Sequence, residues 1–306
     1  SEPLKRELVR QENGAEWPEA VLTGLVLSAL KRHDATSPSQ TRPLIVLPTL
    51  YRVWAITRAR QILAWMSSWA PQEIKGFIRG RSASDCWRFV ACQVERALIT
   101  GDTGALTGGV LDIIKCFDHL PRHPIFAAAL MLGLPKQILE PWARYLSSLE
   151  RRFLVFGHPS PGLRSTTGFP QGDPLSVVAM LIISLLWLIS LKAVVPAIMP
   201  LVFADNWEWL TDSVQNTVRA MNHSRTFCAM LDLSMATSRT ELKTWTWSTS
   251  PALREELDDT QTFCDITVAL DARDLGAHIT YTHQWRNATQ KNRLDDAKNQ
   301  LRRLAT

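Results

Sequence analysis

The alternation of apolar and polar positions predicts a chain that mixes helices with short buried strands. Apolar side chains that recur at the spacing of a helical turn indicate amphipathic helices. This spacing predicts helices over residues 50–69, 124–149 and 211–230. A further helix is predicted to begin at a cap formed by Ser82 or Ser84 and to end at residue 98. Residues 16–30 fit either a helix or a helix that runs into a strand.

Two stretches predict buried strands, because apolar side chains surround isolated polar residues. Residues 109–114 (GVLDII) are broken only by Asp112. Residues 201–209 (LVFADNWEW) predict two strands that meet at Asp205-Asn206, since Asp and Asn tolerate positive φ and suit a tight hairpin. A further hairpin is predicted within residues 152–168. Together these segments predict an α+β fold.

The most apolar segment, residues 175–191 (LSVVAMLIISLLWLISL), has two interpretations. A transmembrane helix needs about 20 apolar residues, so this run lies near the lower limit. A helix buried on all sides within a large domain has the same composition. Lys192 and Pro196 end the run and no second such segment follows, which favours the buried helix and a protein without a membrane partner.

Composition narrows the class of protein. The chain has 306 residues, 46% of them hydrophobic, and 12 tryptophans, which excludes a disordered protein. A net charge of +5 gives a mild bias toward polyanionic partners. Five scattered cysteines without a Cys-x-x-Cys pair argue against a disulfide framework or zinc knuckle. The same cysteines favour an intracellular setting. The start at Ser1 shows no basic-then-apolar leader, which predicts no signal peptide, and the missing Met suggests a part of a longer polypeptide.

The candidate chemistry starts from two isolated carboxylates on strand-like segments, Asp112 and Asp205. Burying a lone carboxylate costs several kcal/mol unless it is paired or bound to a metal. A pair of carboxylates that shares cations is the arrangement used in phosphoryl and nucleotidyl transfer. Between them, residues 168–176 (GFPQGDPLS) predict a rigid loop whose backbone can approach a ligand. The alternative interpretation is that Asp112 and Asp205 are strand ends near solvent, and that residues 168–176 form only a tight turn before a buried helix.

Three blocks then resemble the A, B and C motifs of reverse transcriptases, particularly those of non-LTR retrotransposons. They are LDIIKCFD (111–118), GFPQGDPLS (168–176) and FADN (203–206). Asp112 and Gln171 are 171 − 112 = 59 positions apart, and Asp205 follows 205 − 171 = 34 positions later, as in the family. Four flanking blocks also resemble family motifs: RPL at 42–44 with Tyr51-Arg52, GFIRGRSASD at 76–85, LKTWTW at 242–247 and DLGAHI at 274–279.

The resemblance implies a right-hand polymerase core, with an antiparallel palm sheet packed on helices. Residues 1–105 would form most of the fingers. Residues 106–285 would form the palm, with an insert at about 121–168 that contributes to the fingers. Residues 286–306, a basic amphipathic helix by their pattern, would begin a truncated thumb.

The resemblance also implies roles for individual residues. Asp112 and Asp205, with the backbone carbonyl of Ile113, would bind two Mg²⁺ ions. Phe117 would stack against the sugar and exclude a 2′-hydroxyl, although an ordinary core phenylalanine is the alternative. Gln171 and Gly172 would form the floor beneath the template base and the incoming nucleotide.

Three basic residues would contact the nucleotide. Lys31 and Arg42 would clamp the triphosphate, since the guanidinium fork suits bidentate phosphate contacts. Lys243 would donate a proton to the pyrophosphate leaving group. For Lys31 and Lys243, a plain surface lysine is the alternative interpretation.

Asn206 departs from the family, which has Asp-Asp at this turn. Because Asn lacks the negative charge, we expect weaker Mg²⁺ binding or a preference for Mn²⁺. Asn206 would still belong to the catalytic turn, but it leaves activity in doubt and could equally mark a decayed copy of a mobile element.

The resemblance therefore implies a nucleotidyltransferase that copies an RNA template onto a DNA primer with dNTPs, within a longer polyprotein and in the nucleus. Three alternatives stay open. They are an RNA-dependent RNA polymerase, a decayed remnant that only binds nucleic acid, and an integral membrane protein.

Overall fold

The structure, a computed structural model, describes residues 2–30, 41–155, 157–238 and 243–284, and four isolated positions beyond them. Lys31 and most of the predicted basic helix at 286–304 lie outside the described residues. The helices are α1 (Glu2–Glu12), α2 (Thr49–Trp69), α3 (Ala83–Thr100), α4 (Cys116–His119), α5 (Arg122–Met131), α6 (Lys136–Ser148), α7 (Ser176–Val194), α8 (Val214–Met230) and α9 (Pro251–Asp259). The strands are β1 (Thr23–Leu30), β2 (Thr41–Val46), β3 (Thr107–Asp112), β4 (Glu150–Val155), β5 (His158–Pro159), β6 (Leu163–Arg164), β7 (Met199–Phe203), β8 (Asn206–Thr211), β9 (Trp245–Ser248), β10 (Thr267–Ala269), β11 (Asp271–Asp274) and β12 (Ala277–Thr280).

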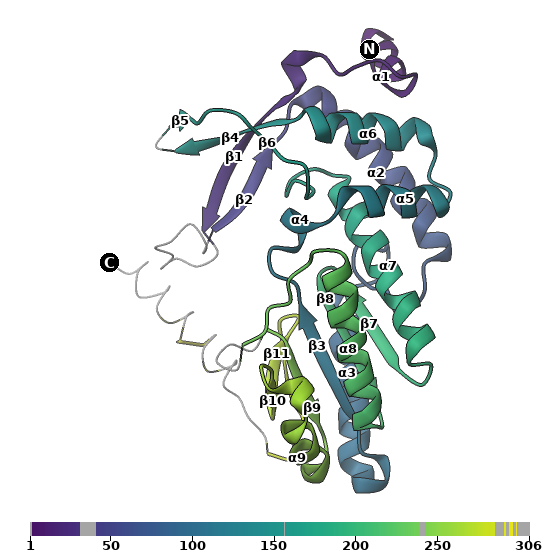
Figure 1. Ribbon diagram of the computed structural model, residues 1–306, viewed down its shortest axis with the longest axis vertical. Coiled ribbons are helices and arrows are strands. Elements are labelled where there is room, and N and C mark those ends of the chain that lie inside the picture. Colours follow the sequence, from purple (N-terminus) through teal and green to yellow (C-terminus); the bar gives the residue numbers. More distant parts are fainter. Residues whose placement is uncertain are drawn as a thin grey trace.

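The N-terminal sheet joins β1 and β2 to strands from the middle of the chain. Its order is β2-β1-β4-β5, with β6 also paired to β4. β1 and β2 are antiparallel, whereas β1 and β4 run parallel, from Thr23 opposite Glu150 to Val26 opposite Phe153. Figure 1 shows this sheet at the upper left, beside α2 and α6. Residues 16–30 therefore form a 3-10 turn that runs into strand β1, which matches the second of the two predicted alternatives and contradicts a helix throughout.

The central sheet has the order β10-β9-β3-β8-β7. Its strands are antiparallel except for the parallel pair of β9 and β10. Successive side chains of a strand point to opposite faces. On β8, Trp207 is buried against α7, where its ring stacks on Trp187 at 4.8 Å between centroids. Leu210 packs on the opposite face, in a second core with α3 and the β11–β12 hairpin.

α7 is the apolar segment of the sequence, and it runs through the main core. Twelve of its residues are buried, among them Met180, Ile183 and Trp187. Within the described residues it is the one helix long and apolar enough to cross a membrane. A core helix has the same length and composition, and the burial of α7 matches the interpretation as a core helix.

Local signals placed several elements correctly. α2 begins and ends within a residue of its predicted range. Ser82 caps α3 in a capping box with Asp85, which bonds back to the Ser82 amide at 2.7 Å. The predicted helix over residues 124–149 is instead two helices, because Gly133 adopts φ +95° and ends α5.

A segment between α2 and α3 covers the outer edge of β7. The amide of Val202 donates to the carbonyl of Glu73 at 2.9 Å, and the amide of Lys75 donates to the carbonyl of Val202 at 2.8 Å. A side chain at Gly76 would collide with the backbone of Ala204, since a Cβ there would lie 2.5 Å from its nitrogen. Residues 73–76 therefore pack directly against the turn between β7 and β8.

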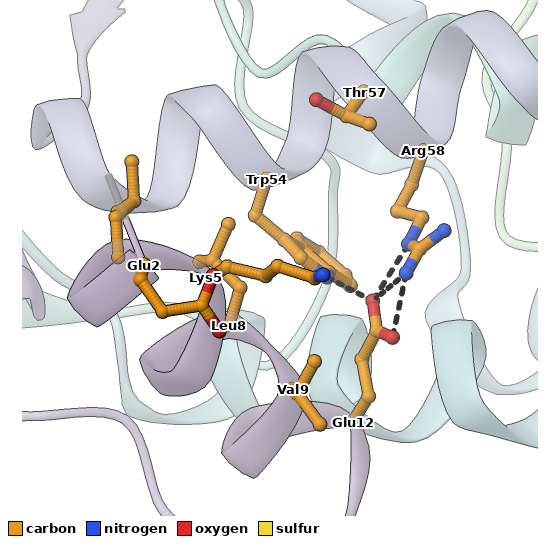
Figure 2. A pocket seen from close by; sticks show the side chains of 9 residues that line it. Glu2, Lys5, Leu8, Val9, Glu12, Trp54, Thr57 and Arg58 are labelled. Atoms are coloured by element: carbon orange, nitrogen blue, oxygen red, sulfur yellow. Dashed lines mark hydrogen bonds and ion pairs between the residues drawn. The ribbon is translucent and has the colours of Figure 1, made fainter.

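A cavity of about 630 Å³ lies between α1 and α2, away from that turn. Figure 2 shows the carboxylate of Glu12 facing Trp54 and Arg58 of α2. Glu12 accepts from the indole nitrogen at 2.7 Å and from two guanidinium nitrogens at 2.6 Å each. These bonds join α1 to α2, so Glu12, Trp54 and Arg58 in the cavity wall hold the two helices together.

Candidate active site

The sheet register brings the three acidic and amide residues of the predicted site together. β3 ends at Asp112, which lies directly opposite Asn206, the first residue of β8. Phe203 pairs with Asn206 across the β7–β8 hairpin, so Ala204 and Asp205 form its tip. Ala204 adopts positive φ (56°), and neither Asp205 nor Asn206 does. The sequence placed the turn correctly but assigned the left-handed conformation to the wrong residues.

The electrostatics of the turn show that both carboxylates lie close to one buried thiol. Burial raises the pKa of the Cys116 thiol well above its usual range, and the charges of Asp205 and Asp112 raise it further. Burial also raises the pKa of Asp205, whereas the guanidinium of Arg42 lowers it. A partly desolvated carboxylate is stabilised in its charged form by a nearby cation. Arg42 of β2 is therefore close enough to the catalytic turn to act on it.

The backbone beyond Asp112 is fixed by a segment that the sequence had not singled out. The amide of Ala236 donates to the carbonyl of Asp112 at 2.8 Å, and the amide of Ile114 donates to the carbonyl of Ser234 at 2.8 Å. Ile113 forms an antiparallel bridge with Met235. Because successive carbonyls of an extended chain alternate in direction, the Ile113 carbonyl points away from residues 234–236.

Two carboxylates and a carbonyl are oxygen ligands of the kind that Mg²⁺ prefers. Mg²⁺ is typically held by one or two carboxylates together with substrate phosphates, and Asp112 and Asp205 fit that donor set. Within the described residues no group of three or more His, Cys, Asp or Glu side chains forms a complete metal cage. The residues present therefore fit a cation that the substrate helps to bind.

The loop that contains Gln171 is fixed to the segment after Asp112. The amide of Phe169 donates to the carbonyl of Phe117 at 2.7 Å. The side-chain amide of Gln171 donates to Asp118 at 3.2 Å. Gly168 adopts φ +76°, and a Cβ there would lie 2.2 Å from the carbonyl oxygen of Asp118. Glycine is required at this contact because both the backbone conformation and the space exclude a side chain.

The other side of the same loop contacts the N-terminal sheet. The amide of Ile45 donates to the carbonyl of Gln171 at 2.7 Å. Gly172 adopts φ +121°, and a Cβ there would lie 2.4 Å from the carbonyl oxygen of Ile45. Gln171 and Gly172 therefore join the N-terminal sheet to the segment after β3.

The buried Asp173 and the partly buried Arg122 hold this loop in place. Asp173 accepts bonds from the hydroxyl of Tyr51 at 3.0 Å and the indole of Trp142 at 3.3 Å. Burial raises the pKa of Asp173 to about 6, and these donors oppose the shift. Arg122 donates to four backbone carbonyls at 2.7 to 3.1 Å, three of them in residues 165–168.

The remaining predicted residues differ in how closely the structure relates them to the site. Phe117 lies on α4 and is partly buried against the main core. Lys243 is exposed and precedes Thr244, whose hydroxyl accepts a bond from the amide of Asp112 at 3.2 Å. Phe117 therefore lies on the helix that follows β3, and Lys243 directly precedes a residue that bonds to Asp112.

Sequence reasoning missed four charged residues around the site. Asp118 is half-buried; burial raises its pKa, and Arg151 of β4 is the main charge that opposes the rise. Arg151 could have been found only through the pairing of β4 with β1. Glu208 and Asp274 are buried together beside Asn206. The signal for Glu208 was an acidic residue between two tryptophans in a buried strand.

Comparison with known families assigns most of the chain. Residues 30–251 match the family described as reverse transcriptase (RNA-dependent DNA polymerase). The chain belongs to the reverse transcriptase family. Comparison with curated proteins finds no match.

Solved reverse transcriptase structures show the same fold. Apo telomerase from Candida tropicalis, truncated from its C-terminal domain, superposes with a TM-score of 0.60 at 11% identity, over 89% of this chain and 56% of that one. Telomerase from Candida albicans in complex with a TWJ fragment of telomeric RNA gives 0.57 at 12% identity, over 94% and 49%. The chain spans about half the length of these proteins. It therefore has the right-hand polymerase fold that the sequence predicted.

Proposed function

We propose that this reverse transcriptase is an RNA-directed DNA polymerase that adds dNTPs to a primer 3′-hydroxyl by a two-metal mechanism. The observation that carries the proposal is the meeting of Asp112 and Asp205 at adjacent ends of the central sheet. Two divalent cations bound there would activate the primer hydroxyl and neutralise charge on the triphosphate. Mg²⁺ is the expected ion, and Asn206 makes Mn²⁺ a useful substitute.

The surrounding residues support distinct parts of that reaction. Arg42 of the N-terminal sheet lowers the pKa of Asp205 by its charge, which supports a role in binding the triphosphate. Gln171 and Gly172 provide the rigid surface beneath the base pair. Phe117 lies one turn beyond the catalytic strand, where it would exclude a 2′-hydroxyl. Lys243 is the proposed proton donor to pyrophosphate.

We assign the subdomains in the same way. The N-terminal sheet with α2 would form the fingers, and β4 to β6 would be the part of the insert at 121–168 that returns to them. The central sheet with α7 and α8 would form the palm. Residues 286–306 would begin the thumb. The motif sequences at 111–118, 168–176 and 203–206 support a non-LTR type of element, whose other domains would complete the protein.

Primer extension tests the proposal. Purified protein is given an RNA template, a DNA primer and dNTPs, with Mg²⁺ and Mn²⁺ compared. Asp112→Asn and Asp205→Asn should each lower extension at least about a thousandfold while the circular dichroism spectrum stays unchanged, since charge stabilisation is the largest catalytic contribution. Asp259→Asn, an exposed change at the end of α9, is the matched control and should retain full extension.

Each alternative has its own outcome in this assay. An RNA-dependent RNA polymerase would extend with ribonucleotides in preference to dNTPs. A decayed remnant would bind template–primer without extending it in either metal. Retention of a tenth of the activity in either carboxylate variant would overturn the assignment of the metal-binding pair.

A further inference from the structure

Asn206 is tied to a buried pair of acids on the face of the central sheet away from α7. Its side-chain amide donates to a carboxylate oxygen of Asp274 at 3.2 Å. Asp274 is the last residue of β11, and it is 2% exposed. Glu208, two residues after Asn206 on the same face of β8, is also 2% exposed. The contact therefore joins the catalytic hairpin to the β11–β12 hairpin.

Burial and mutual repulsion favour one shared proton between the carboxylates of Glu208 and Asp274. Burial raises the pKa of Glu208, and the charge of Asp274 beside it raises that pKa further. Glu208 Oε1 and Asp274 Oδ2 are buried and have no other hydrogen-bond partner among the described residues. A single proton on Glu208 that is donated to Asp274 satisfies this pair, and leaves Asp274 as the charged member.

Within the part of the chain that the structure describes, no salt bridge pairs a cation with either acid. Cys86 of α3 and Tyr281 are both buried; burial raises the pKa of each, and the charges of the two acids raise it further. The amide of Asn206 is therefore a principal donor to the Asp274 carboxylate, together with the backbone at Leu275.

An aspartate at position 206 would conflict with this arrangement. The N–H donor would be lost, and a carboxylate would take its place beside Asp274 as the third acidic group after Glu208 and Asp274. Like charges repel strongly where burial shields them from water. Because the acceptor is a carboxylate, the orientation of the Asn206 amide is also determined: Nδ2 faces Asp274 and Oδ1 lies on the other side.

We propose that Asp274 is a positioning residue for the catalytic hairpin: its carboxylate holds the Asn206 amide, Glu208 holds Asp274, and Asn206 serves as a hydrogen-bond donor in place of a second metal-binding carboxylate. The β11–β12 hairpin thereby fixes the first residue of β8, directly opposite Asp112. The catalytic role of the contact between Asn206 and Asp274 rests on the proposed polymerase function, whereas the contact itself does not. Under this proposal the Asn at 206 is matched to Asp274 and is no sign of decay.

A double-mutant cycle tests the proposal. Thermal unfolding is measured in EDTA for wild type, Asn206→Asp, Asp274→Asn and the swapped pair, which restores one amide and one carboxylate. Asn206→Asp should lower Tm by about 3 °C or more with Asp274 present, and by less than about 1 °C with Asn at 274. Asp271→Asn is the matched control, because Asp271 lies on the same hairpin but faces His278 at 3.4 Å, and it should not relieve the loss.

Primer extension provides the functional readout. The kcat of Asn206→Asp in Mg²⁺ should fall about tenfold and recover within about threefold of wild type in the swapped pair, because the donor–acceptor contact is restored. If Asp274→Asn does not fold, Asp274→Ser replaces it, since its hydroxyl accepts the amide without a charge. An equal Tm loss in both backgrounds, or a gain in kcat from Asn206→Asp alone, overturns the proposal. If neither wild type nor any variant extends a primer, the proposed function is wrong. The Tm differences in the cycle still show whether Asn206 and Asp274 interact.

Discussion

Asp112, the last residue of β3, lies directly opposite Asn206, the first residue of β8. Residues paired across neighbouring strands present their side chains on the same face of a sheet. The register therefore places a carboxylate beside an amide, with Asp205 one residue earlier at the hairpin tip. A slip of one residue would bring Trp207 opposite Asp112 and move every side chain of β8 to the other face. The arrangement of Asp112, Asp205 and Asn206 therefore depends on the register of these strands.

Replacing the phenylalanine on α4 tests sugar selection. Phe117→Ala should raise the use of ribonucleotides relative to deoxynucleotides by at least about tenfold, because removing the ring opens space for a 2′-hydroxyl without altering either carboxylate. Single-nucleotide incorporation with matched ribo- and deoxynucleotides measures the ratio. Phe89→Ala, a partly buried phenylalanine on α3, should leave the ratio unchanged. An unchanged ratio in Phe117→Ala would make this residue part of the core alone.

A methyl group at position 172 should disrupt the joint between the loop and the N-terminal sheet. Gly172→Ala introduces strain at φ +121° and a contact of 2.4 Å with the Ile45 carbonyl, so we expect a loss of about 3 kcal/mol in the free energy of unfolding and little remaining extension. Gly133→Ala is the matched control. Its φ is +95° with open space around it, so only the backbone cost of about 1 kcal/mol should appear in chemical denaturation. Equal losses would contradict the role of the Ile45 contact.

The buried Asp173 predicts a pH dependence of stability with a definite sign. Burial raises its folded-state pKa to about 6, above the ordinary 3.8, so the folded protein binds the proton more tightly than the unfolded chain. The contribution of Asp173 to the free energy of unfolding should therefore increase as pH falls from about 7 to about 4. Urea denaturation across this range measures it. The difference in stability between wild type and Asp173→Asn should grow toward low pH, and a difference that is independent of pH would refute the prediction.

Binding of template–primer should depend steeply on salt. Basic side chains that contact backbone phosphates release counterions, and each such contact adds roughly 0.7 to 0.9 to the slope of log affinity against log salt. Fluorescence anisotropy with a labelled duplex over a range of KCl concentrations gives that slope. Arg42→Gln should reduce dNTP affinity more than it reduces the duplex slope, since the charge of Arg42 acts on Asp205. A slope near zero for wild type would count against a nucleic-acid cleft.

Local patterns were sufficient to predict the elements that carry the chemistry. The lone Asp112 in an apolar run located β3, and the turn at Asp205 located the β7–β8 hairpin, because period-two burial and turn chemistry act within a few residues. The capping residue of α3 and the buried α7 were predicted for the same reason.

Contacts between distant segments were not predictable in this way. The parallel pairing of β1 with β4 joins residues more than a hundred positions apart, and neither strand carries a signal that names its partner. The sequence of segment 274–279 shows only a resemblance to a family motif, yet Leu275 and Gly276 both adopt positive φ and form the turn between β11 and β12. The meeting of Glu208 with Asp274 depends on that turn, so the sequence showed two acidic residues without showing a pair.

The packing of residues 73–76 along β7 has a consequence for solubility. β7 is the last strand of the central sheet, and an open edge strand with unpaired amides and carbonyls can recruit another chain and start aggregation. The amide and carbonyl of Val202 are already bonded to Glu73 and Lys75 of the same molecule. The strand that leads into the catalytic hairpin is thus closed to a second copy at this point. The connection between α2 and α3 protects the protein from self-association there.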